Sequence, residues 1–317
     1  MSSELTIGID IGGTKVLGGV VTPEGEVLAT ARRDTPAEDV SKTLDFIIEV
    51  IEELTATHPV TAVGIGAAGW IDADRSRVLY AANLAWRDEP LRDKVAARVH
   101  LPVVVENDAN AAAWAEFRHG AARDAKDSMV LLTVGTGIGA GIVFGGKVIR
   151  GAYGVAAEMG HARAVPGGLP CGCGRHGCHE QYASGSALVR YARAGAAADP
   201  ENAKVLLDLA GGAADAISGP TVTRAAQQGD PVACAAFNEL GQWLGACFVD
   251  VVQTLDPEIL VVGGGVIDAG ELLLAPTRKA YTEQLAARGT LPVAPIVAAK
   301  LHNTAGLVGA ADLARFR

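Results

Sequence analysis

The sequence LTIGIDIGGTKVLGGVVTPEGEVLATAR, residues 5–32, contains three short apolar runs. Glycines and a threonine join the first two runs, and the segment TPEGE at 22–26 separates them from the third. Short apolar runs bounded by Gly and Pro are typical of strands connected by tight turns. The stretch therefore predicts a three-stranded antiparallel meander.

Beyond this meander, the chain alternates between helical and strand-like patterns. Residues 60–69 and 101–106 are nearly continuous apolar runs, as expected of strands buried on both faces of a sheet. Residues 109–120 predict a helix that ends at a glycine. A further helix is predicted over 39–55, where apolar side chains recur at helical spacing: Val40, Leu44, Ile47, Ile48, Ile51 and Leu54.

Residues 129–154, MVLLTVGTGIGAGIVFGGKVIRGAYG, repeat the opening plan of strand, Gly/Thr turn, strand, Gly-Gly turn and strand. A strand running into three glycines follows at 258–268, and a last helix at 305–316. A repeated supersecondary unit points to duplicated halves. The predicted fold class is α/β, with two similar lobes of mixed sheets flanked by helices and a ligand cleft between them.

Composition narrows the class of protein. The 317 residues are 49% hydrophobic and 20% charged, which is typical of a globular chain, and no apolar run is long enough to predict a membrane span. The net charge of -9 argues against nucleic acid as a partner, because phosphate backbones are bound by clustered Lys and Arg. The first residues lack the basic and apolar regions of a signal peptide, so a cytoplasmic protein is expected.

Three glycine-rich turns, the first at residues 10–15, the second at 135–139 and the third at 263–265, are candidates for phosphate binding. Glycine lets backbone N–H groups approach an anion closely. The alternative for the first turn is an ordinary tight hairpin with a bulge. No Walker A loop occurs, and the spacing does not suit a dinucleotide fingerprint. Paired Gly/Thr hairpins on duplicated lobes resemble the superfamily of sugar kinases, actin and heat-shock ATPases, which favours ATP as ligand. The alternative of a chaperone or scaffold with this fold would need a large additional segment.

The segment VVVENDANAAA places Asn107 and Asp108 where a strand gives way to a helix. Both residue types are preferred helix N-caps, and a cap needs no further function. Phosphoryl transfer to a hydroxyl, however, requires a nearby carboxylate. Asp108 is the candidate general base, and a helix N-terminus is expected to make it a weaker one by favouring the ionised form.

Residues 161–180, HARAVPGGLPCGCGRHGCHE, concentrate three of the five cysteines. Three thiolates and an imidazole suffice for a closed tetrahedral zinc site, and glycines let the backbone fold tightly around an ion. A C-x-C pair would close a strained disulfide ring, and redox motifs are usually C-x-x-C. The predicted ligands are His161, Cys171, Cys173 and Cys178.

Spacing alone leaves other arrangements open. His176 and His179 compete as ligands, and redox chemistry or unpaired thiols are the alternatives to a metal. Cys234 and Cys247 lie in apolar helical surroundings and are expected to be core residues.

Taken together, DIGGTK, ENDANAAA, GTGIGAGI, AEMGH at 157–161, CGCGRHGCHEQYASG at 171–185 and VVGGG resemble the ROK family. Within that family they are most similar to the bacterial glucokinases of actinobacterial type. The resemblance implies two ribonuclease H-like (actin-like) lobes: a smaller one from 1–115 plus 302–317, and a larger one from 116–301 that carries the zinc loop. Repressors of the family carry a helix-turn-helix before the first strand, so the short segment here argues against DNA binding.

The resemblance also implies roles for individual residues. Asp108 corresponds to the catalytic base, and the sugar contacts correspond to Asn83, Asn107, Asp108, Glu158, His161 and Glu180. The zinc ligands correspond to His161, Cys171, Cys173 and Cys178. Nucleotide and Mg²⁺ are expected to be held by Asp10, Gly12, Gly13, Thr14, Lys15, Gly135, Thr136, Gly137, Gly263, Gly264 and Gly265.

The implied activity is ATP-dependent phosphorylation of D-glucose to glucose 6-phosphate, with Mg²⁺ and a structural zinc ion. Alternatives are a kinase for fructose, mannose, allose or an N-acetylhexosamine, or a sugar sensor without turnover. Polyphosphate could replace ATP, as in some relatives. A homo-oligomer, dimer or tetramer, is expected.

Overall fold

A computed structural model describes residues 4–82 and 84–316 and confirms a mixed α/β architecture. The chain forms two compact units. The first comprises Met1–Leu131, Gly141–Ala157 and Lys300–Arg317, and the second comprises Leu132–Ala140 and Glu158–Ala299. Asn83, predicted to contact the sugar, lies outside the described residues.

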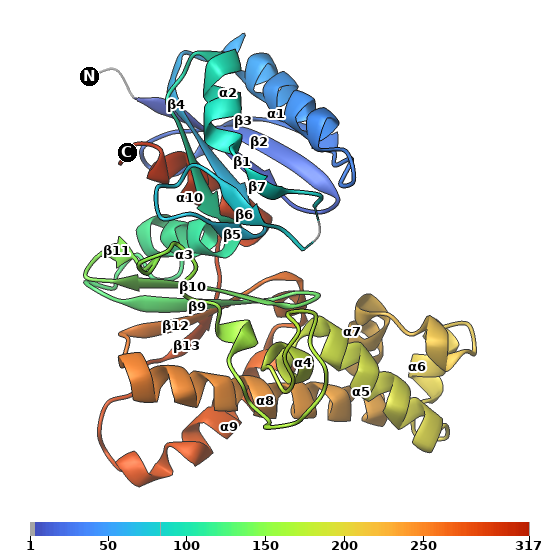
Figure 1. The fold of residues 1–317 in the computed structure, drawn as a ribbon. Helices are drawn as coiled ribbons and strands as arrows, with labels where there is room; N and C mark the ends of the chain where they lie inside the picture. Colours follow the sequence, from blue (N-terminus) through green and yellow to red (C-terminus); the bar gives the residue numbers. More distant parts are fainter. Residues whose placement is uncertain (1–3, 83, 317) are drawn as a thin grey trace. The chain divides into compact units, whose positions relative to one another are not determined.

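The first sheet contains the predicted meander. β1 (Leu5–Ile11), β2 (Lys15–Val21) and β3 (Val27–Asp34) pair antiparallel, and β4 (Val60–Ala67) and β8 (Val103–Asn107) extend the sheet in parallel. The strand order is β3-β2-β1-β4-β8 (Figure 1). The meander and both buried strands are confirmed.

Helices pack on both faces of this sheet: α1 (Val40–Thr55), α2 (Leu91–Val99), α3 (Asp108–His119) and α10 (Ala305–Leu313) (Figure 1). Glycines show which helix covers which face. A β-carbon on Gly18 would press on α1 side chains, whereas one on Gly8 or Gly64 would overlap carbonyl oxygens of α10. The absence of side chains at these two positions lets α10 pack directly on the backbone of β1 and β4.

The second sheet repeats the plan of the first. It consists of β9 (Met129–Val134), β10 (Ile138–Phe144), β11 (Lys147–Val148), β12 (Ile259–Gly263) and β13 (Ile296–Ala298). Its order is β11-β10-β9-β12-β13, which matches the first sheet strand for strand, with an antiparallel pair at one edge and a parallel pair at the other. The predicted duplication is confirmed.

The second unit is largely helical, as expected: α4 (Glu180–Ala183), α5 (Gly185–Ala198), α6 (Lys204–Leu209), α7 (Gly219–Gln227), α8 (Pro231–Leu255) and α9 (Glu271–Gln284). Among the described residues, α8 is long and apolar enough to cross a membrane. Half of its most apolar window is buried inside the protein, where α8 packs against α5 and α9. Cys247 is fully buried on this helix, which confirms its role in the core.

Shorter elements complete the chain. A small antiparallel sheet, which the sequence did not predict, is formed by β5 (Trp70–Ile71), β6 (Val78–Tyr80) and β7 (Arg87–Glu89). Short 3-10 turns occur at Met159–His161, Ala214–Ala216, Gly265–Ala269, Ala286–Arg288 and His302–Thr304.

Candidate functional site

The junction of β8 and α3 holds the predicted base. Asn107 is the N-cap of α3, and its Oδ1 accepts a hydrogen bond from the Asn110 N–H at 2.9 Å. Its Nδ2 donates to the Gly69 carbonyl at 3.0 Å. Asn107 therefore caps α3, and its contacts with the part of the chain that the structure describes leave one lone pair and one N–H of its amide for a ligand.

Asp108 is the first residue of α3, and its Oδ1 accepts the Ala109 N–H at 2.9 Å. Burial raises the pKa of Asp108, and the backbone hydrogen bonds only partly oppose this. The expectation that the helix N-terminus weakens this base is wrong in direction, because desolvation raises the pKa of the Asp108 carboxyl more than the backbone hydrogen bonds lower it. Asp108 is a stronger proton acceptor than an exposed aspartate.

Asp10 is the penultimate residue of β1, in the same unit. Burial and the neighbouring Asp108 carboxylate raise the pKa of Asp10 to about 6, while Lys15 acts in the opposite sense. Gly306, in the first turn of α10, leaves space here, since a β-carbon on it would lie 3.0 Å from Asp10 Oδ1. Two carboxylates that disfavour each other's charge form an arrangement that a divalent cation relieves. The residues present thus fit the Mg²⁺ that the sequence predicts.

The first glycine turn joins β1 to β2. The Gly12 N–H donates to the Lys15 carbonyl at 3.0 Å, and the Thr35 hydroxyl donates to the Gly12 carbonyl at 2.9 Å. These bonds close a tight hairpin whose Thr14 is exposed. The turn is a rigid loop with accessible backbone, which suits an anion as well as an ordinary hairpin.

The second and third glycine turns lie together in the second unit. A β-carbon on Gly264 would lie 2.5 Å from the Val134 carbonyl oxygen, so the turn after β12 packs against the strand that leads into Gly135. The Gly185 N–H donates to the Gly135 carbonyl at 2.7 Å, and the Ser186 hydroxyl donates to the Thr136 carbonyl at 2.7 Å. The N-terminus of α5 therefore adjoins both turns.

Glu180, predicted to contact the sugar, connects the glycine turn to the cysteine loop. Its Oε2 accepts the Ile138 N–H at 3.2 Å, and its Oε1 lies 3.7 Å from Cys171 Sγ. A β-carbon on Gly137 would overlap the same carboxylate. A side chain at position 137 would therefore displace the Glu180 carboxylate from this place.

The four predicted metal ligands converge. One potential ligand atom from each of His161, Cys171, Cys173 and Cys178 lies within 4.8 Å of all the others. Cys171 Sγ is 3.6 Å from His161 Nδ1, and Cys173 Sγ is 3.6 Å from Cys178 Sγ. A tetrahedral zinc ion with Zn–S bonds of about 2.3 Å requires ligand separations of about 3.7 Å. The donor set and its spacing fit zinc.

The competing histidines are placed elsewhere. His176 is exposed, and His179 Nε2 pairs with Asp250 Oδ2 at 3.3 Å. Gly177 has a φ of +76° and passes so close to the Val165 carbonyl that any β-carbon would overlap it. The backbone of the loop is therefore already folded around the four donors.

The statistical model of the ROK family matches residues 6–317. The chain belongs to the ROK family. It is 52% identical to a glucokinase of Streptomyces coelicolor over 311 residues, which cover 98% of each chain. It is 34% identical to an N-acetylmannosamine kinase of Yersinia pseudotuberculosis, again over 98% of each chain.

Among solved structures, this ROK chain is similar to a ROK family glucokinase from Streptomyces griseus in complex with glucose and AMPPNP. The TM-score is 0.90 at 54% identity, and the match covers 99% of this chain and 100% of the other. This neighbour supports the actin-like ATPase fold.

Sequence reasoning did not identify every group at these sites in the ROK chain. It missed the contacts of Gly185 and Ser186 with the second glycine turn and the position of Gly306 beside Asp10. Gly306 could have been found from the sequence, because it lies in the predicted last helix. That helix had to pack on the first sheet, where a glycine allows a close approach.

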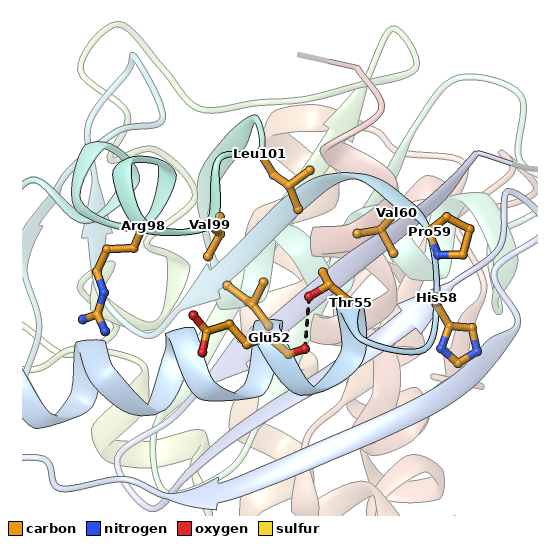
Figure 2. Close-up of a pocket in the computed structure, with 9 residues that line it drawn as sticks. Glu52, Thr55, His58, Pro59, Val60, Arg98, Val99 and Leu101 are labelled. Atoms are coloured by element: carbon orange, nitrogen blue, oxygen red, sulfur yellow. Dashed lines mark hydrogen bonds between the residues drawn. The ribbon is translucent and has the colours of Figure 1, made fainter.

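A pocket of about 350 Å³ lies in the first unit, between the C-terminal half of α1 and the end of α2 (Figure 2). Glu52, His58 and Arg98 line it together with apolar side chains, and the Thr55 hydroxyl donates to the Glu52 carbonyl at 3.1 Å. None of the predicted site residues that the structure describes lines this pocket. It is separate from the candidate active site.

Proposed function

We propose that this ROK protein transfers the γ-phosphoryl group of ATP to the 6-hydroxyl of D-glucose. The observation that carries the proposal is its full-length similarity, at 54% identity and a TM-score of 0.90, to a glucokinase crystallised with glucose and AMPPNP. The 52% identity to a second glucokinase supports the same substrate.

Asp108 would act as the general base. The proton of the sugar 6-hydroxyl passes to the carboxylate as the oxygen–phosphorus bond forms, and the bond from the γ-phosphorus to the β,γ-bridging oxygen breaks to release ADP. Support comes from burial, which raises the pKa of Asp108 and makes it a better proton acceptor. Its Oδ1 accepts the Ala109 N–H, and the proposal assigns the other oxygen to the sugar.

The glycine turns would hold the nucleotide. The turns formed by Gly12, Gly13, Thr14 and Lys15 and by Gly135, Thr136 and Gly137 would bind the phosphate oxygens through backbone N–H groups other than those of Gly12 and Gly135, which close the two turns at 3.0 Å. Gly263, Gly264 and Gly265 would line the adenosine. Asp10 would hold Mg²⁺, directly or through water. A bound Mg²⁺ neutralises negative charge on the transferred phosphoryl group.

The sugar would be oriented by Asn83, Asn107, Glu158, His161 and Glu180. His161 would give Nδ1 to zinc and Nε2 to a sugar hydroxyl, which fixes its tautomer. Support comes from His161 Nδ1, which lies 3.6 Å from Cys171 Sγ. Zinc, held by His161, Cys171, Cys173 and Cys178, would be structural, and its binding energy would rigidify the loop.

A kinase for a related sugar is the second candidate, because a relative of 34% identity is an N-acetylmannosamine kinase. We also propose a cytoplasmic location and a homo-oligomeric state. Two lobes, 1–115 with 302–317 and 116–301, would close on the substrates and exclude water.

A coupled assay that follows ADP release tests the function. Purified protein is given ATP and, in turn, glucose, mannose, fructose, allose, N-acetylglucosamine and N-acetylmannosamine. We expect the highest kcat/KM for glucose. A higher value for another sugar would move the assignment to that kinase, and binding without turnover of any sugar would indicate a sensor. The same assay with polyphosphate in place of ATP tests the donor.

A further inference from the structure

Glu106 is a buried acid that no step of the proposed mechanism uses. It is the penultimate residue of β8, directly before Asn107 and Asp108, and its side chain is only 3% exposed. Burying a carboxylate is costly unless charged and hydrogen-bonding partners surround it. The partners of Glu106 therefore indicate which contacts offset the cost of burying its carboxylate.

The two oxygens of Glu106 have separate partners. Oε2 accepts from Arg150, with Nε and one terminal nitrogen each at 2.6 Å, and lies 3.5 Å from Arg75 Nε. Oε1 accepts the backbone N–H of Asn107 at 3.2 Å and the Asn110 side-chain amide at 3.2 Å. One oxygen thus binds the first turn of α3, and the other binds two arginines.

Both arginines belong to segments that border the β8–α3 junction. The Arg75 carbonyl accepts the Val105 N–H at 3.0 Å. Arg150 begins a loop that its own carbonyl closes by accepting the Ala156 N–H at 3.0 Å. Gly154 of this loop lies so close to the backbone of Ile71 and Asp72 that no side chain would fit there.

This loop leads along the chain to Glu158, a proposed sugar contact. The Arg150–Glu106 pair is the charged contact between the loop and the strand that carries Asn107 and Asp108. Nε and one terminal nitrogen of Arg150 both donate to Glu106 Oε2. The pair therefore restricts the loop more tightly than a single hydrogen bond would.

We propose that Glu106 is a positioning residue of this kinase: it sets the first turn of α3, which carries Asp108, and through Arg150 the loop before Glu158. The proposal rests on the proposed function. A glutamine at 106 would turn an N–H toward either the arginines or the Asn107 and Asn110 donors, and would leave two guanidinium groups without a buried counter-charge.

The test compares Glu106→Gln with the matched variant Glu89→Gln. Glu89 is also a buried glutamate of the first unit, paired with Lys94 at 2.7 Å on the small sheet. We expect Glu106→Gln to lower kcat by about 10²-fold, since small misplacements of reacting groups cost about this much. KM for ATP should change little, and Glu89→Gln should keep the wild-type kcat.

Arg150 gives a second, independent variant in case Glu106→Gln folds poorly. Arg150→Ala should lose kcat in the same way, guanidinium chloride at millimolar concentration should restore part of it, and Arg150→Lys should lie between the two. Thermal unfolding is recorded for every variant, and rates are compared below the onset of unfolding. A merely structural role would lower Tm without guanidinium rescue or an effect on kcat.

Wild-type kcat in Glu106→Gln, or equal losses in Glu106→Gln and Glu89→Gln, would overturn the proposal. Its failure is separable from failure of the proposed function, because wild-type protein is assayed first. If another sugar is the substrate, the same comparison is made with that sugar. If no sugar is turned over, calorimetric sugar binding replaces kcat, and unchanged affinity in Glu106→Gln would refute the positioning role.

Discussion

The β8–α3 junction and the cysteine loop at 161–180 both supply groups to the proposed active site, but they are organised by different forces. At the junction, protein groups hold one another in place: Asn107 caps the helix, Glu106 binds its first turn, and burial raises the pKa of Asp108. In the loop, four metal-ligand atoms meet within 4.8 Å. The junction should therefore respond to substitutions and pH, and the loop to removal of metal.

The largest expected effect is on the chemical step at the junction. Asp108→Asn removes the proton acceptor, so kcat should fall by about 10²–10⁴-fold, the range typical of general-base catalysis. The variant should stay folded, because the amide removes a carboxylate whose ionisation burial opposes. Steady-state kinetics measure kcat, and an unfolding curve recorded in parallel shows whether the variant is folded. Near-normal kcat would show that Asp108 is not the base.

The second effect concerns the loop. Cys173→Ser should abolish zinc binding and lower glucose turnover by at least about tenfold, because structural zinc sites contribute folding energy directly. Elemental analysis gives the metal content per chain, and unfolding curves give Tm. Cys234→Ser is the matched control, because Cys234 lies on α8, is not one of the four clustered metal ligands, and donates to the Ala226 carbonyl of α7. Full activity in zinc-free Cys173→Ser protein would refute the proposed role of the metal.

Much of the difference between the junction and the loop could be predicted from the sequence, because the patterns that indicate it lie within short stretches of the chain. Apolar runs and glycines predicted the meander, its repeat, the strand before Asp108 and the helix after it. Cysteine spacing predicted a metal site, and the family resemblance selected His161 among the candidate histidines. The repeat predicted that the two halves share one plan, whereas the strand order of each sheet comes from the structure. These signals need no knowledge of what lies far away along the chain.

The missing parts depend on distant contacts. The basicity of Asp108 was predicted with the wrong sign, because burial is a property of the folded unit and the helix N-terminus is visible in the sequence. Arg150 lies 44 residues from Glu106, so nothing local reveals the pair. The strands of the small sheet are two or three residues long, too short for a periodic pattern.

A smaller effect is expected where the loop meets the second glycine turn. Gly137→Ala would place a β-carbon on the Glu180 carboxylate, so one of them must move. We expect KM for ATP and for glucose to rise by about tenfold, equivalent to about 1.4 kcal/mol each. Gly219→Ala is the control, because a β-carbon there meets no atom within 4 Å. Unchanged KM values in Gly137→Ala would remove this turn from the site.

The smallest effect is on stability, at Asp10. In the folded protein the pKa of Asp10 is raised from 3.8 to about 6. The protonated carboxyl therefore stabilises the folded state below pH 3.8, and this stabilisation is lost as the pH rises through 6. Without Mg²⁺, Asp10→Asn should therefore exceed wild type in Tm by about 2–4 °C near pH 8, and the difference should vanish near pH 4. Asp34→Asn is the control, because the Asp34 side chain is 89% exposed. The difference in Tm between this variant and wild type should stay the same from about pH 4 to about pH 8. For Asp10→Asn, a constant difference across this range would contradict the burial of Asp10.

The central claim is a division of labour in which Asp108 acts on the proton and the zinc-braced loop holds the sugar. Calorimetric titration of glucose into Asp108→Asn and Cys173→Ser protein, side by side with wild type, tests it directly. The account predicts near wild-type Kd for Asp108→Asn and a Kd at least about tenfold weaker for Cys173→Ser, a loss of about 1.4 kcal/mol. Weakened binding in Asp108→Asn with unchanged binding in Cys173→Ser would contradict it.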